Sequence, residues 1–138
     1  MECQCGLKQV REEGVTVRYN VLLVGVDVGF RDSLAEELEK NMSVCAAGHR
    51  EDAIKVLQQE QIDGVVLDLE DFHGEGLALL QALRSASPQM AVVVVFPRVR
   101  SLQVVKLMRL GASNCLMKPI SAHVLRQTLE GELAGPEG

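Results

Sequence analysis

The chain contains very few aromatic residues. There is no Trp among its 138 residues, and Phe, Trp and Tyr together make up only 3% of the sequence. The hydrophobic core must therefore be built from Val, Leu, Ala, Ile and Met. Hydrophobic residues account for 47% and charged residues for 24%, a balance that is typical of one folded domain and argues against a disordered chain.

Segments that would target the protein to a membrane are also absent. No apolar run is long enough to span a bilayer. Residues 1–5, Met-Glu-Cys-Gln-Cys, lack the charged and apolar regions of a signal peptide. We therefore expect a soluble, cytoplasmic protein that has no membrane partner.

Cysteine is scarce, with four residues in the whole chain. Cys45 and Cys115 fall in predicted strands, where a free Cys packs as a small hydrophobic residue. Cys3 and Cys5 form an isolated Cys-x-Cys in a polar segment over residues 1–18, which we interpret as a flexible tail. The alternative, a metal or redox site, needs more ligands than this pair supplies.

Acidic residues are missing from a long stretch of the chain. Residues 1–75 hold sixteen acidic and seven basic side chains, whereas residues 76–129 hold no Asp or Glu. The acid-free stretch contains seven basic residues, namely Arg84, Arg98, Arg100, Lys106, Arg109, Lys118 and Arg126. The net charge of −5 hides this asymmetry. Two interpretations remain open: an uneven solvated surface, or a positive face that meets an acidic partner.

Short apolar runs alternate with segments of helical periodicity. The runs predict strands over residues 19–26, 42–47, 63–69, 91–96 and 114–117. The periodic segments predict helices over residues 30–41, 51–61 and 120–133, and two more helices that include residues 77–83 and 102–110. Five such alternations indicate an α/β fold with a parallel sheet covered on both faces. Ligand sites of such sheets lie at the carboxyl ends of the strands, where Asp68 and Lys118 are expected.

Several motifs together resemble the receiver domain of bacterial response regulators, the CheY-like family. They are the run 63–69 ending near Asp68, Glu75-Gly76-Leu77, Leu110-Gly111-Ala112, Lys118-Pro119, and Asp27 with Arg31 and Leu34 after the first strand. The resemblance covers residues 19–133, and leaves a tail over 1–18 and a frayed end over 134–138. It implies a flavodoxin-like, doubly wound five-stranded sheet in the order 2-1-3-4-5. It also implies a cis peptide bond before Pro119.

Members of this family take part in two-component signal transduction, in which a histidine kinase transfers a phosphoryl group to an aspartate. By the resemblance, Asp68 is the phosphoacceptor position and Lys118 contacts the phosphoryl group. The family also uses one Mg²⁺, held by two acidic residues after the first strand, and a Thr or Ser after the fourth strand. Charge neutralisation around the transferring phosphoryl group supplies most of the catalysis.

The chain departs from this pattern at most of the reactive positions. Gly25 and Val26 stand where the acidic pair is expected, and Phe96 replaces the hydroxyl residue. Phe72 replaces the proline that follows the aspartate, and Cys115 replaces the aromatic residue that swings inward on activation. Only two reactive residues remain, Asp68 and Lys118. We therefore predict that they form an ion pair in the resting state, with Phe96 and Phe72 filling the space nearby.

Three functional hypotheses follow. The first is an atypical receiver that signals through protein contacts, with weak or no phosphorylation and no cofactor. The second is a working phosphoacceptor that binds Mg²⁺ through Asp68, Asp27, a carbonyl near Glu70 and waters. The third, binding of a nucleic acid or another polyanion, is disfavoured by the lack of aromatic stacking residues and the negative net charge. No motif supports an enzyme, since the chain has no Gly-rich phosphate loop and no Ser-His-Asp order. His73 is interpreted as a solvated loop residue.

The resemblance also indicates a partner face. In this family the fourth helix, fifth strand and fifth helix form the usual output face. Here that face is predicted to carry only basic charges, namely Arg98, Arg100, Lys106, Arg109 and Arg126. We therefore expect a protein partner with an acidic surface, with a histidine kinase as a further candidate. A symmetric dimer through this face would bring like charges together and is disfavoured.

Overall fold

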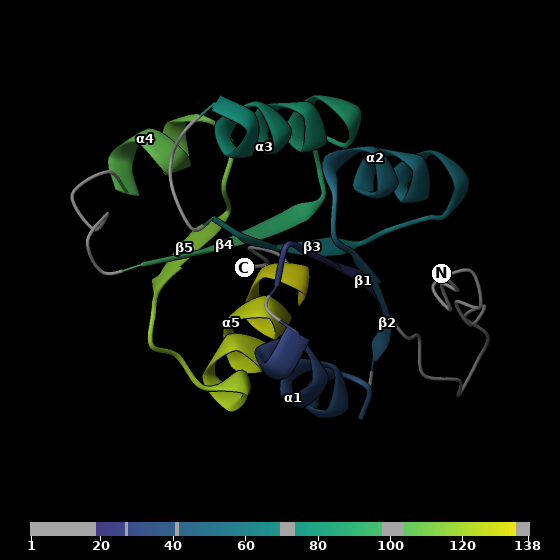
Figure 1. Ribbon diagram of the computed structural model, residues 1–138, viewed down its shortest axis with the longest axis vertical. Helices are drawn as coiled ribbons and strands as arrows, with labels where there is room; N and C mark the ends of the chain where they lie inside the picture. The colour runs from purple at the N-terminus through teal and green to yellow at the C-terminus, as the bar shows by residue number, and fades with distance from the viewer. Residues whose placement is uncertain (1–18, 27, 41, 70–73, 98–103, 135–138) are drawn as a thin grey trace.

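The protein folds into one five-stranded sheet with helices on both faces (Figure 1). The computed structural model describes residues 19–26, 28–40, 42–69, 74–97 and 104–134. The strands are β1 (Tyr19–Val24), β2 (Met42–Ala47), β3 (Gly64–Asp68), β4 (Ala91–Phe96) and β5 (Asn114–Met117). The helices are α1 (Val28–Leu38), α2 (Arg50–Gln59), α3 (Gly74–Ala86), α4 (Val104–Arg109) and α5 (Ala122–Ala134).

The sheet topology is the one predicted. All four strand pairings are parallel and the order is β2-β1-β3-β4-β5. The strands therefore end at one edge, and the register places Asp68 beside Val95 of β4. Because β4 lies between β3 and β5, the residues that follow β5 reach the same edge as Asp68.

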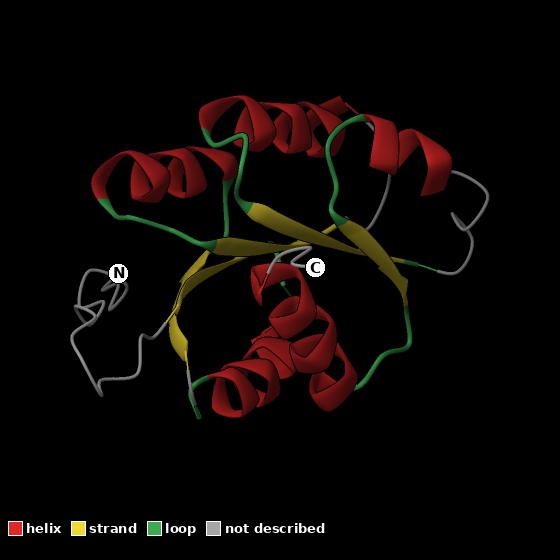
Figure 2. Cartoon of the chain, turned by 180° about the vertical axis from the view of Figure 1, so that it is seen from behind, coloured by secondary structure: helices red, strands yellow, loops and turns green. Residues whose placement is uncertain are grey.

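Two hydrophobic clusters occupy the two faces of the sheet. One lies under α2, α3 and α4, and the other lies against α1 and α5, as the two helical layers in Figure 2 show. Every residue of β4 is buried, which explains its run of four valines: a strand covered on both faces needs apolar side chains in both directions. The buried large residues are aliphatic apart from Phe96, as the scarcity of aromatic residues predicted.

The main boundary difference lies at the end of β1. The sequence predicts a strand over 19–26, but β1 ends at Val24. Gly25 has a φ of +70°, in the left-handed region that an extended strand cannot contain, so the chain turns out of the sheet there. The helices match the predicted ones in order, with ends that shift by a few residues, as helix ends commonly do.

The cysteine predictions are half right. Cys115 is a free thiol and is half-buried, as expected. Cys45 is buried but is disulfide-bonded, so the expectation of a free thiol there is wrong. The predicted tail over 1–18 and residues 135–138 lie outside the described part of the chain. None of the described helices is long and apolar enough to cross a membrane.

Candidate functional site

Asp68 and Lys118 meet at the carboxyl edge of the sheet. Asp68 is the last residue of β3, and Lys118 directly follows β5. The backbone N–H of Lys118 donates to the carbonyl of Phe96 at 2.8 Å, and the N–H of Leu69 donates to Val95 at 2.9 Å. These bonds extend the ladders on both sides of β4 and hold the two side chains at neighbouring strand ends.

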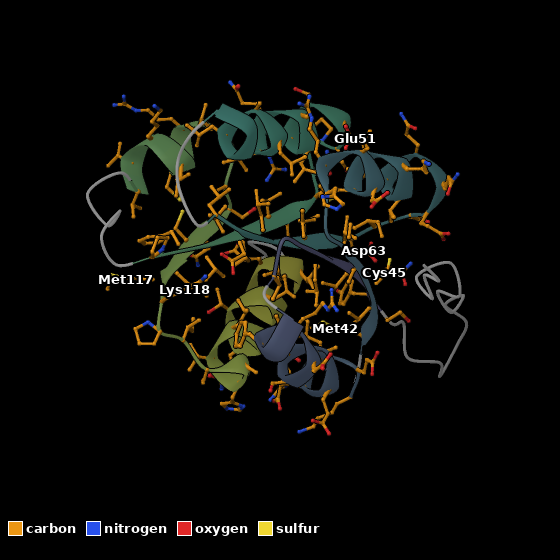
Figure 3. The ribbon with its side chains drawn as sticks, in the orientation of Figure 1. Met42, Cys45, Glu51, Asp63, Met117 and Lys118 are labelled. Atoms are coloured by element: carbon orange, nitrogen blue, oxygen red, sulfur yellow. The ribbon has the colours of Figure 1, made fainter. Side chains whose placement is uncertain are left out.

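The two side chains form the predicted ion pair. Lys118 Nζ lies 2.9 Å from Asp68 Oδ1. The carboxylate is only 3% exposed, whereas the lysine side chain is 28% exposed. Lys118 lies beside the end of β5 (Figure 3). The Lys118–Pro119 peptide bond is cis, which confirms the expectation from the resemblance. The pair thus consists of a buried anion neutralised by a partly exposed cation.

The two positions expected to hold acidic residues have different surroundings. At Gly25, a Cβ atom would lie 3.3 Å from the carbonyl oxygen of Asp68, and φ is positive. Val26 is buried and belongs to the cluster against α1 and α5. One position is therefore a tight left-handed turn beside Asp68, and the other is part of the hydrophobic core.

The residues at the hydroxyl and aromatic switch positions both join the core. Phe96 is buried in the cluster under α2, α3 and α4, and Cys115 packs against the same cluster. Burial raises the pKa of the Cys115 thiol to about 11, so it is protonated at neutral pH. The idea that Phe96 also fills the space beside Asp68 stays a prediction.

Several candidate residues lie outside the described part of the chain. They are Asp27, Glu70, Phe72 and His73, together with Arg98 and Arg100. Within the described residues, no group of three or more His, Cys, Asp or Glu side chains could hold a metal ion. Asp68 is thus the one member of the proposed Mg²⁺ set whose place is known, and its neighbour there is a cation.

The predicted basic face divides into two parts. Lys106 and Arg109 are exposed on α4. Arg126 on α5 is instead held by two carboxylates, with Glu37 Oε2 2.7 Å from its Nε and Glu130 Oε2 3.0 Å from its Nη1. Its charge is therefore compensated within the molecule. Glu130 follows Arg126 by four residues and could have been recognised from that spacing, but Glu37 comes from α1.

Arg84, one of the basic residues of the acid-free stretch, has a structural role that the sequence did not indicate. Its guanidinium donates to the carbonyls of Gly111, Ser87, Pro88 and Met90, and to Ser113 Oγ. Three of these acceptors lie in the connection between α3 and β4, and the other two lie in the turn before β5. Arg84 thereby links the turn between α3 and β4 to the turn before β5, whose acceptors are 27 and 29 residues away in the sequence.

Comparisons with known proteins agree with this architecture. The family model described as the response regulator receiver domain matches residues 21–130. The probable C4-dicarboxylate response regulator DctR of Bacillus subtilis is 32% identical over 92 residues, which cover 66% of this chain and 41% of that protein. The photosynthetic apparatus regulatory protein RegA of Rhodobacter capsulatus is 29% identical over 120 residues, which cover 85% of this chain and 65% of that protein.

Solved structures show the same fold. A CheY-like response regulator receiver domain protein from Methanospirillum hungatei superposes with a TM-score of 0.76 at 22% identity, covering 85% of this chain and 94% of that one. The chain spans less than two thirds of the curated relatives it matches. From the match of the family model to most of its length, the chain belongs to the family of response regulator receiver domains.

Proposed function

We propose that this receiver domain works in two-component signalling without metal-assisted phosphoryl transfer, and acts through contacts with other proteins. The observation that supports this proposal is the state of the two positions after β1. Gly25 provides no side chain and Val26 is buried in the core, so neither presents a carboxylate at the edge of the sheet. Mg²⁺ is usually held in octahedral geometry by one or two carboxylates together with waters, and neither of these two side chains is a carboxylate.

Without a bound metal ion, the rate of phosphorylation should fall strongly. A metal ion contributes several kcal/mol to the stabilisation of a transferring phosphoryl group. Each 1.36 kcal/mol corresponds to a factor of about ten in rate, so phosphorylation without the metal is slower by about a thousandfold or more. Lys118 can offset part of this loss, because its ammonium already lies beside Asp68.

The proposal also names a class of partner and a cellular compartment. We infer that the partner is a protein with an acidic surface, and that the domain works in the cytoplasm. The chain itself is proposed to have no enzymatic activity, although its curated relatives include a protein-glutamate methylesterase/protein-glutamine glutaminase of Rhodospirillum rubrum. That protein is 30% identical over 96 residues, which make up only 25% of its length.

A second candidate function, phosphoacceptance from a histidine kinase, has one observation in its favour. The buried carboxylate and its lysine are both present and in contact, at 2.9 Å. Mg²⁺ would then be held by Asp68 with Asp27, a carbonyl near Glu70 and waters. This second function needs metal ligands from the segments after β1 and β3 to replace the two acidic residues that the chain lacks after β1.

Chemical phosphorylation distinguishes the two functions. The chain is incubated with acetyl phosphate and Mg²⁺ and its intact mass is measured over time, alongside a receiver domain that has both acidic residues. We expect the reference domain to gain one phosphoryl group while this chain gains none. A gain of one phosphoryl group that Asp68→Asn abolishes would overturn the proposal in favour of the second function.

A further inference from the structure

Strand β2 carries a disulfide bond. Cys45 is disulfide-bonded, and Cys115 is a free thiol. The chain has four cysteines in all, so a bond within the chain leaves only Cys3 or Cys5 as the partner of Cys45. The disulfide therefore links β2 to the segment before β1, about 40 residues earlier in the sequence. Taken alone, the Cys3-x-Cys5 motif has too few partners for a redox site, and Cys45 supplies the missing cysteine.

Strand β2 lies at an edge of the sheet. Within the described residues it pairs with β1 alone, and Figure 3 shows Cys45 on this outer strand. Edge strands are commonly protected by charged side chains or proline. The sequence of β2, Met-Ser-Val-Cys-Ala-Ala, contains neither. A covalent bond at Cys45 therefore restrains a strand that has little other support at its outer side.

Cys45 itself is shielded from solvent. It is only 4% exposed and belongs to the hydrophobic cluster under α2, α3 and α4. A thiolate breaks a disulfide by attacking one of its two sulfur atoms, and access decides which of the two is attacked. Because Cys45 is buried, an external thiolate attacks the sulfur of its partner, Cys3 or Cys5. Cys45 is then the leaving group.

The cellular compartment decides whether such a bond is permanent. Disulfides are rare in the reducing cytoplasm, and those that form there are usually transient and serve in redox sensing. We propose that Cys45 and the Cys3-x-Cys5 motif form a reversible thiol–disulfide site that exchanges with a low-molecular-weight thiol of the glutathione class. This inference rests on the cytoplasmic location in the proposed function, and it is independent of the chemistry at Asp68.

Cys115 is not part of the site. It lies on β5, at the opposite edge of the sheet from β2. The thiolate is the form of cysteine that attacks a disulfide, and burial raises the pKa of the Cys115 thiol to about 11. Cys115 is therefore protonated at neutral pH and should not exchange with the bond at Cys45. It serves as an internal reference thiol in the experiment below.

The exchange consists of two balanced steps. In reduction, a glutathione thiolate attacks the sulfur of Cys3 or Cys5, the S–S bond breaks, and the Cys45 thiolate leaves and takes up a proton. A second glutathione thiolate attacks the resulting mixed disulfide, and releases glutathione disulfide and the second protein thiol. Two electrons and two protons thus pass from two glutathione thiols to the protein disulfide, and oxidation by glutathione disulfide is the reverse.

Reduction should loosen β2. Without the bond, this edge strand opens locally more often, whereas β4 lies between β3 and β5 and is paired on both sides. The site thereby couples the redox state of the cell to the stability of one edge of the sheet. No phosphoryl group takes part in this coupling.

The test counts free thiols in the whole chain. The protein is equilibrated in a glutathione buffer rich in either the disulfide or the thiol, then quenched with acid, denatured, alkylated with N-ethylmaleimide and weighed by mass spectrometry. We expect two alkyl groups after the disulfide-rich buffer and four after the thiol-rich buffer. Trypsin should release residues 1–8 and 41–50 of the oxidised chain as one linked pair of peptides.

The matched control is Cys115→Ser, a cysteine substitution on the other edge strand. It should bind one and three alkyl groups in the two buffers, because the bond at Cys45 is unchanged. Cys3→Ser/Cys5→Ser removes both possible partners without altering the described core, and should bind two alkyl groups in either buffer. Circular dichroism checks that both variants are folded.

Hydrogen exchange measures the effect on β2. Backbone amides over residues 42–47 should exchange about threefold faster or more in the reduced wild type than in the oxidised one, while those of β4 do not change. In Cys3→Ser/Cys5→Ser the rates over 42–47 should be fast in both buffers. Equal rates for oxidised and reduced wild type would overturn the proposed coupling.

Four results of the thiol count would overturn the site itself. They are four alkyl groups in the disulfide-rich buffer, two in the thiol-rich buffer, a disulfide-linked dimer, and an oxidised chain that yields no linked pair of peptides 1–8 and 41–50. The second of these would make the bond permanent and structural. Phosphorylation of Asp68 by acetyl phosphate would instead refute the proposed function and leave the thiol counts as expected.

Discussion

At the scale of single residues, the contact between Asp68 and Lys118 is asymmetric. The carboxylate is buried almost completely, while more than a quarter of the lysine side chain reaches solvent. Taking a carboxylate out of water is costly, and a cation at 2.9 Å compensates that cost. Lys118 is therefore important to stability as well as to any chemistry at this edge of the sheet.

Removing the lysine should destabilise the fold strongly. We expect Lys118→Met to lower the free energy of unfolding by about 3 kcal/mol, because it removes the cation that lies 2.9 Å from the buried Asp68 carboxylate. The free energy is measured by urea denaturation. Lys55→Met, at an exposed position of α2, is the control and should change it by less than about 0.5 kcal/mol.

The double variant Asp68→Asn/Lys118→Met decides whether the pair is the cause. It should recover part of the stability lost in Lys118→Met, since the negative charge that Lys118 neutralises is removed as well. Additive losses from the two single substitutions would show that the ion pair contributes nothing.

At the scale of secondary-structure elements, charged side chains join α1 to α5. Arg126 Nε lies 2.7 Å from Glu37 Oε2, and His123 Nδ1 lies 3.4 Å from the same oxygen. Lys40 adds a contact to Glu37 Oε1 at 3.2 Å. Hydrogen bonds from Arg126 first, then from Lys40 and His123, lower the pKa of Glu37 from 4.5 to about 2.

This depressed pKa predicts a pH-dependent contribution to stability. A carboxylate with a lower pKa in the folded state stabilises the fold above its unfolded pKa, and loses that contribution as the pH falls through the folded pKa. We therefore expect the wild type to exceed Glu37→Gln in urea midpoint above pH 4.5, and the difference to vanish as the pH approaches about 2. Glu36→Gln, at an exposed position of the same helix, is the matched control for the substitution itself.

The turn between α4 and β5 depends on a glycine. Gly111 has a φ of +120°, and a Cβ atom there would lie 2.8 Å from Cγ of Arg84. We expect Gly111→Ala to lower the free energy of unfolding by about 2 kcal/mol, because it strains the backbone and displaces the Arg84 side chain. Urea denaturation measures the loss.

Gly131 is the matched control within α5. A Cβ atom there would have no neighbour within 4 Å. Gly131→Ala should therefore stabilise the protein by about 1 kcal/mol, through the higher helix propensity of alanine. Equal effects of the two substitutions would contradict the argument for Gly111.

At the scale of the whole molecule, charge is distributed unevenly around a sheet covered on both faces. The acidic excess lies in residues 1–75, and the acid-free stretch includes most of α3, all of β4, α4 and β5, and most of α5. The exposed cations of α4 would repel their counterparts in a symmetric contact through this side. The arrangement favours association with a different protein.

We therefore predict that the isolated chain is a monomer. Sedimentation velocity at low salt should show one species with the mass of a single chain, since the repulsion is strongest when screening is weak. A two-fold dimer through α4, β5 and α5 would contradict the prediction. Loss of such a dimer in Lys106→Glu/Arg109→Glu would locate it.

Much of the fold could be predicted because the signals for its elements are local. The valine run of β4 and the helical spacing of leucines are properties of short segments, and parallel topology follows from their alternation. The end of β1 could not be predicted, because the apolar run continues to Val26 while the turn at Gly25 depends on its approach to Asp68. The apolar pattern therefore overestimated the length of that strand.

By itself, the sequence determined the order of the elements, the parallel sheet and the edge at which Asp68 and Lys118 meet. Only the tertiary structure decided how deeply the Asp68 carboxylate is buried in their ion pair, that Arg126 is neutralised by Glu37 from α1, and that Val105 and Met108 remain exposed. The physical reason is the range of the interactions. Backbone periodicity depends on neighbours along the chain, whereas ion pairing and burial depend on residues that folding brings together from distant segments.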